Sequence, residues 1–63
     1  MKLRPDRYVV FLDPSELWTV WDNLRDEPAQ LGQNILIGLS EIESIAACRV
    51  MNDLDREREE TAA

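Results

Sequence analysis

The sequence predicts a mainly α-helical fold, in which a short N-terminal β-strand precedes an antiparallel two-helix hairpin. Three observations predict it. One six-residue run is β-branched and aromatic, one segment carries a helix-start signature, and a long stretch repeats its apolar residues at helical spacing. The expected elements are a strand at about 7–12 and helices at about 14–26 and 29–59, assembled as an oligomer.

The strand is predicted from residues 7–12, RYVVFL, which are rich in β-branched and aromatic side chains. Alternation places Tyr8 and Val10 on one face and Val9 and Phe11 on the other, so both faces are largely apolar. No second run is typical of a strand, and a lone strand leaves its backbone donors and acceptors unpaired. We therefore expect this strand to pair with another chain, most simply a second copy.

The first helix is predicted from the segment DPSE. Asp13 suits the N-cap, Pro14 suits the first helical position, and Glu16 stands three residues after the cap, as in a capping box. Pro28 favours an end before it, because the residue preceding a proline is pushed out of the α region. An apolar stripe at helical spacing supports the assignment: Leu17, Val20 and Leu24.

The second helix, at about 29–59, is predicted from two apolar sets on a helical wheel. The larger set forms one broad face: Leu31, Ile35, Leu39, Ile42, Ala46 and Val50. A second set lies on the opposite side: Ile37, Cys48 and Met51. One short partner helix covers only one side, so the other is expected to meet a second chain. Gly38 and the capping-box pattern from Ser40 to Glu43 leave an alternative, a break into two shorter helices.

The length of the chain also favours an oligomer. We expect residues 1–63 to form one small domain, with a flexible lead-in at 1–6 and a fraying charged tail at 57–63. A chain this short buries only about 60% of its unfolded surface, and its single cysteine cannot form an internal disulfide. The residues predicted to form the interface are Tyr8, Val10, Phe11, Trp18, Trp21, Ile37, Cys48 and Met51.

The composition argues against an enzyme. The sequence has no histidine, and its one cysteine has no base nearby in sequence to activate it. No spacing of carboxylates or thiols matches a metal site, so we expect no catalytic residues, no metal and no cofactor. The net charge of −6 makes nucleic-acid binding unlikely, and no apolar run approaches membrane-spanning length. The expected location is the cytoplasm.

The sequence predicts a small acidic protein–protein interaction module that acts as a homodimer or larger on a protein target, as a regulator, inhibitor or adaptor. An alternative comes from a resemblance. The order strand, helix, helix over residues 7 to about 50 resembles the ribbon-helix-helix family, in which paired strands of a dimer read the DNA major groove. That resemblance implies a dimeric DNA-binding regulator, although an apolar ribbon and an acidic chain depart from the family's pattern.

Overall fold

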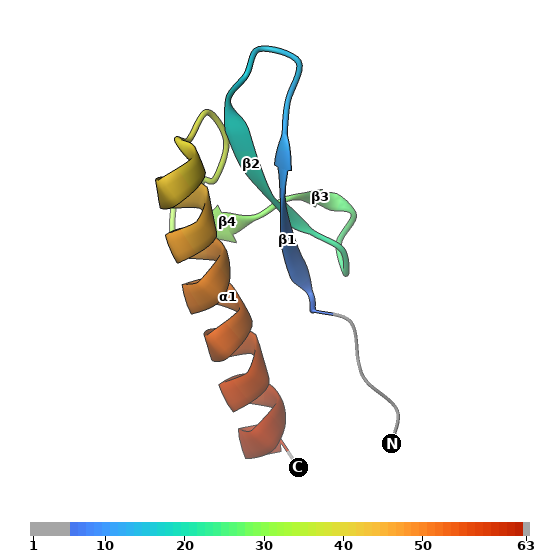
Figure 1. Cartoon of the computed structure of the whole chain (residues 1–63). Helices are drawn as coiled ribbons and strands as arrows, with labels where there is room; N and C mark the ends of the chain where they lie inside the picture. Colours follow the sequence, from blue (N-terminus) through green and yellow to red (C-terminus); the bar gives the residue numbers. More distant parts are fainter. Residues whose placement is uncertain (1–5, 63) are drawn as a thin grey trace.

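The chain forms two small antiparallel sheets and one long helix, as seen in a computed structural model that describes residues 6–62, with side chains for residues 6–58 (Figure 1). Three strands make a sheet in the order β1-β2-β3, two more make a hairpin, and the helix packs on the three-stranded sheet. The predicted two-helix hairpin is therefore wrong. The elements are β1 (Tyr8–Leu12), β2 (Trp18–Asp22), β3 (Glu27–Pro28), β4 (Gln30–Leu31), β5 (Asn34–Ile35) and α1 (Glu41–Ala62).

The strand expected at about 7–12 is present as β1, but its partner belongs to the same chain. β1 pairs antiparallel with β2, from Tyr8 opposite Asp22 to Leu12 opposite Trp18. Residues 18–22, WTVWD, are β-branched and aromatic, which suits a strand. The prediction of a helix at about 14–26 is therefore wrong. The spacing of apolar residues in this short run fits a helix and a strand equally well, and pairing with β1 favours the strand.

The segment DPSE forms the hairpin turn between β1 and β2 rather than the start of a helix. The Asp13 side chain accepts hydrogen bonds from the backbone N–H and the hydroxyl of Ser15, at 2.8 and 2.6 Å, and from the N–H of Leu17 at 3.1 Å. The N–H of Glu16 donates to the Asp13 carbonyl at 3.0 Å, and Glu16 has a positive φ of 67°. A turn followed by a left-handed residue is a common three-residue hairpin connection, and it uses the same residue types as a helix cap.

β2 lies at the centre of the sheet, with partners along both edges. On the side away from β1 it pairs with β3. Backbone groups of β2 also form hydrogen bonds with residues outside that short strand. Val20 donates to the Leu36 carbonyl at 2.9 Å and accepts from the N–H of Ala29 at 2.8 Å, and Trp18 exchanges two hydrogen bonds with Leu39. β1 consequently forms one outer edge of the sheet.

α1 begins only at Glu41, so the helix predicted at about 29–59 is wrong over residues 29–40. Before it, the chain makes the β4–β5 hairpin and then turns at Gly38, whose φ is +66°. The alternative of two shorter helices that meet near Gly38 is also wrong, because strands and not a helix precede Gly38, although the helix does begin after it. Ser40 and Glu43 form a reciprocal capping box, with 3.0 Å between the Ser40 N–H and the Glu43 carboxylate and 3.1 Å between the Glu43 N–H and the Ser40 hydroxyl.

The chain ends fall largely outside the described residues. Of the lead-in predicted at 1–6, only Asp6 is described. The charged tail predicted at 57–63 is helical through Ala62, and Ala63 lies outside the description. The described helix is not long and apolar enough to cross a membrane.

Replacing Ser40 with alanine is expected to lower the free energy of unfolding by about 1 kcal/mol, because the hydroxyl that accepts from the Glu43 N–H is lost. Urea denaturation followed by circular dichroism measures this change. Glu41→Ala, in the same helical turn, is the control. Equal stabilities of the two variants would contradict the capping role of Ser40.

The core is small and lies between the sheet and α1. Its buried apolar residues come from β1, β2, the two residues that flank the β4–β5 hairpin, and the helix: Tyr8, Val20, Ala29, Leu36 and Met51. Ser44, fully buried on the inner side of α1, satisfies its hydroxyl by donating to the Glu41 carbonyl at 2.7 Å.

The resemblance to the ribbon-helix-helix family rested on the order strand, helix, helix. The described residues do not form that order.

Candidate interaction surfaces

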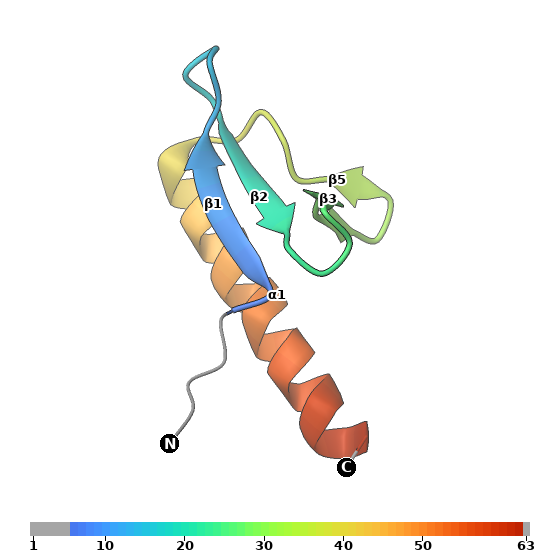
Figure 2. The same cartoon turned by 90° about the vertical axis from the view of Figure 1, so that its right-hand side faces the viewer.

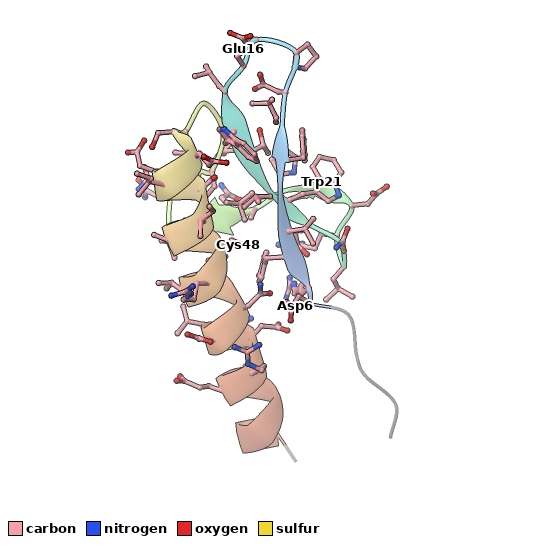
Figure 3. The ribbon with its side chains drawn as sticks, in the orientation of Figure 1. Asp6, Glu16, Trp21 and Cys48 are labelled. Carbon is pink, nitrogen blue, oxygen red and sulfur yellow. The ribbon has the colours of Figure 1, made fainter. Side chains whose placement is uncertain are left out.

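Among the described residues, one face of the three-stranded sheet is not covered by the helix and carries no charged side chain; it is called the open face below. In an antiparallel pair, residues directly opposite each other point to the same side. The positions turned away from α1 are therefore Val9 and Phe11 of β1, Thr19 and Trp21 of β2, and Pro28 of β3. The rings of Phe11 and Trp21 meet edge to face, with centroids 5.8 Å apart. Figure 3 shows Trp21 on the side of β1 opposite to α1.

This open face departs from the usual pattern. An antiparallel sheet that packs one face on a helix normally presents polar residues on the other. Here four of the five outward positions are apolar. Val9 and Phe11 remain 39% and 41% exposed, whereas Trp21 and Pro28 are half-buried and Thr19 is buried. The face is uncharged in a chain whose net charge is −6. Such an apolar surface is typical of a protein interaction site.

A second feature is the unpaired outer edge of β1. The backbone N–H and C=O groups of Trp18 and Val20 in β2 bond to residues on the side away from β1. Leu12 lies opposite Trp18 and Val10 lies opposite Val20, so these two cross-strand pairs are not hydrogen-bonded to each other. The N–H and C=O groups of Val10 and Leu12 therefore point outward, along the free edge. Over the described residues, these four groups have no hydrogen-bond partner, so they can accept a further strand.

The same edge is closed at Tyr8 by α1. The Asn52 side chain spans the two edge groups of Tyr8: its oxygen accepts from the Tyr8 N–H at 2.9 Å, and its amide donates to the Tyr8 carbonyl at 3.0 Å. The Cys48 thiol also donates to that carbonyl at 3.3 Å. The free part of the edge is thus limited to Val10 and Leu12.

An open groove of about 270 Å³ follows this edge, between β1 and α1. Its apolar wall is formed by Val10, Ile45 and Cys48. Its polar end is formed by Asp6, Arg49, Asn52 and Arg56. Arg56 pairs with Asp53 and Asp6, whereas Arg49 is exposed and has no ion pair among the residues whose side chains are described.

A charged network fixes α1 against the strand that carries this edge. Arg7, immediately before β1, donates to both oxygens of Asp22 at 2.9 Å and to Asp55 of α1 at 3.0 Å. Asp22 also accepts from the backbone N–H groups of Leu24 and Arg25. These hydrogen bonds, first of all that from Arg7, hold the pKa of Asp22 below its ordinary value. The network joins the end of the sheet to the C-terminal half of the helix.

The alkylation of Cys48 by iodoacetamide is expected to be slower in the folded protein than in urea. Burial raises the pKa of the Cys48 thiol, so less of the reactive thiolate is present near neutral pH. Figure 3 shows Cys48 on the side of α1 that faces the sheet. Mass spectrometry at fixed pH measures both rates, and equal rates would contradict the protection.

Within the described residues, no three potential metal-ligating side chains gather at one place.

The residues predicted as an interface are divided between the inside and the outside of the molecule. Tyr8 and Met51 belong to the core, and Cys48 is half-buried against Tyr8. Val10 and Trp18 are half-buried on the helix side of the sheet. Those that remain on an outer surface are Phe11 and Trp21, on the open face, and the exposed Ile37.

Sequence reasoning missed Thr19 and Pro28 of the open face and the backbone of Val10 and Leu12 at the free edge. The alternation in WTVWD is the signal that could have shown Thr19 and Trp21 on one side of a strand. Nothing in the sequence marks which edge of β1 stays unpaired.

Comparison with family models, with curated proteins and with solved structures found no match. The described residues therefore define this molecule only as a three-stranded antiparallel sheet covered on one face by a helix, with a two-stranded hairpin between sheet and helix in the chain.

Proposed function

We propose that this chain is a non-enzymatic protein–protein interaction module that works as a homodimer, in which two copies meet through their open sheet faces. One observation carries the proposal: none of the outward positions on the three-stranded sheet is charged, and Val9 and Phe11 stay exposed there. Burying this face removes apolar area from water, which is the main favourable contribution to association. The dimer is proposed to act on a protein target in the cytoplasm, as a regulator, inhibitor or adaptor.

The absence of charge on this face permits a second copy to bind there despite the acidic character of the chain. Each chain has a net charge of −6, so two copies repel each other wherever their acidic residues come close. The open face holds no charge, and it lets two copies stack as sheet on sheet with the acidic residues outside the contact. A two-fold axis brings the same patch of both chains together, as in most homodimers.

Light scattering coupled to size exclusion is expected to give twice the chain mass at about 100 µM, a concentration at which a dimer with micromolar affinity is mostly formed. Phe11→Glu should give the mass of a single chain, because it places a charge on each side of the contact. The control is Leu24→Glu, which changes an apolar side chain that is 73% exposed in the turn between β2 and β3.

Circular dichroism checks that each variant is folded, and Val9→Glu serves as a second variant of the open face. A wild-type chain that runs as a monomer at this concentration would refute the dimer. So would a Leu24→Glu variant that dissociates as completely as Phe11→Glu.

A further inference from the structure

We infer that the free edge of β1 binds an extended segment of a target protein by strand addition, antiparallel to β1, with the side-chain pattern apolar-x-apolar-x-acidic. This site is distinct from the open face. The open face lies on the side of the sheet away from α1, whereas the edge groove lies between β1 and α1. The inference thus names a second binding surface and the chemistry of what it binds.

The backbone of the edge sets the position of the segment. Val10 and Leu12 each offer an outward N–H and C=O, two residues apart, which is the spacing of two hydrogen-bonded pairs in an antiparallel ladder. An added strand satisfies all four groups. It cannot extend the ladder to Tyr8, because Asn52 already bonds both edge groups of that residue. The ladder is therefore centred on Phe11.

The side chains beside the edge determine the apolar positions. A residue opposite Val10 or Leu12 points to the same side of the sheet as they do, toward α1. There it meets the apolar wall of the groove, made by Val10, Ile45 and Cys48. The residue between them points to the opposite side and can be of any polar type. The segment thus needs apolar side chains two residues apart.

Arg49 determines the acidic position. An antiparallel segment runs from the Leu12 end of the edge toward Tyr8, so the residue two beyond the second apolar one comes level with Tyr8. Cys48 bonds the Tyr8 carbonyl at this level, and the neighbouring Arg49 lines the groove without an ion pair in the described part of the chain. A carboxylate on the segment supplies the missing partner.

A single segment fits this edge, whereas a second copy of the chain does not. Figure 2 shows α1 crossing behind β1, with its first turns emerging beyond the outer edge of that strand. A copy paired through its own β1 about a two-fold axis would bring its α1 to the same side and the same level. An extended segment carries no such helix, and it leaves the groove wall in contact with its apolar side chains.

The probe for this site is the labelled peptide Thr-Leu-Thr-Val-Thr-Glu-Thr, with both ends blocked, titrated with wild-type protein and followed by fluorescence anisotropy. Saturable binding with Kd below about 1 mM is expected, the range of small transient contacts. N-methylation of the Leu or the Val amide should weaken binding by about ten-fold or more, because those N–H groups face β1. N-methylation of the Thr between them should leave binding within about two-fold.

Two matched protein variants test the acidic position. Arg49→Glu should weaken binding by about ten-fold, because it replaces an attraction by a repulsion. Arg25→Glu makes the same charge change in the turn after β2, away from the groove, and should change the Kd by less than about two-fold. The reversed peptide Thr-Glu-Thr-Val-Thr-Leu-Thr should bind more weakly than the probe.

The inference fails if the probe does not saturate up to about 1 mM, if N-methylation acts equally at all positions, or if both arginine variants weaken binding alike. Equal binding of the reversed peptide would overturn the antiparallel direction. The outcome is separate from that for the homodimer. A monomer that binds the probe refutes only the dimer, whereas a dimer that fails to bind it refutes only the strand addition.

Discussion

Replacing Asp22 with asparagine is expected to destabilise the fold by about 3–5 kcal/mol, the range found when one partner of a buried ion pair is removed. The side chains of Asp22 and Arg7 are 5% and 16% exposed, and they are joined by two hydrogen bonds of 2.9 Å. The variant keeps the shape of the side chain but removes the charge that the Arg7 guanidinium faces. Among the described side chains, Asp55 then remains as the one carboxylate paired with that guanidinium.

The free energies of unfolding of the two proteins, from urea denaturation followed by circular dichroism, measure this loss. Asp26→Asn is the matched control, because Asp26 is exposed, lies in the turn that Asp22 helps to close, and has a positive φ of 57°, which asparagine also tolerates. A loss of stability no larger in the Asp22 variant than in the control would show that the ion pair does not hold the sheet and helix together.

The same ion pair predicts a loss of stability in acid. The pKa of Asp22 is lowered in the folded state, chiefly by hydrogen bonds from Arg7, so the unfolded chain binds this proton more readily. The stabilisation is fully present above the unfolded pKa, about 3.9, and is lost as the pH falls through the lower folded pKa. Between about pH 5 and pH 3, the wild type should lose stability faster than Asp22→Asn. Parallel pH profiles would contradict this.

Met51→Ala is expected to lower the free energy of unfolding by about 2–5 kcal/mol, the usual range for truncating a buried methionine. Met51 is 6% exposed and packs in the core with Tyr8 and Val20. Its truncation leaves a cavity between α1 and the sheet. In a chain of this size such a loss is a large fraction of the total stability.

Val50→Ala is the matched control, because Val50 is the neighbouring residue of α1 and is 50% exposed. Urea denaturation at two protein concentrations measures both variants. Val50→Ala should change stability by less than about 1 kcal/mol, as expected for a surface position. An equal loss in both variants would mean that Met51 is not part of the core. A difference that appears only at high concentration would instead place Met51 in contact with a second chain.

Two elements could be predicted from sequence because their signals are local. β1 follows from the apolar β-branched run at residues 7–12, which no other structure explains well. The start of α1 follows from the capping box between Ser40 and Glu43, where the two side chains that satisfy the helix end lie within four residues. In both, the residues that decide the structure are adjacent in the chain.

β2 could not be predicted in the same way. Trp18, Val20 and Trp21 suit a helical stripe as well as a strand, and the cap at Asp13 suits a turn as well as a helix. Pairing with β1 and the contacts beyond β3 favour the strand, and all of these partners lie outside the segment. An ambiguity between two local patterns is resolved here by distant residues.

Local sequence patterns were enough to place β1 and to show an apolar excess too large for so short a chain to bury, and they offered the capped start of α1 only as an alternative to a longer helix. Where these apolar side chains lie depends on how the strands and the helix pack together. Packing α1 on one side of the sheet placed Met51 in the core and left Phe11 and Trp21 on the open face. Pairing on one side of β1 left Val10 and Leu12 at a free edge. The exposure of a side chain depends on which distant segments meet, and no local sequence pattern contains that information.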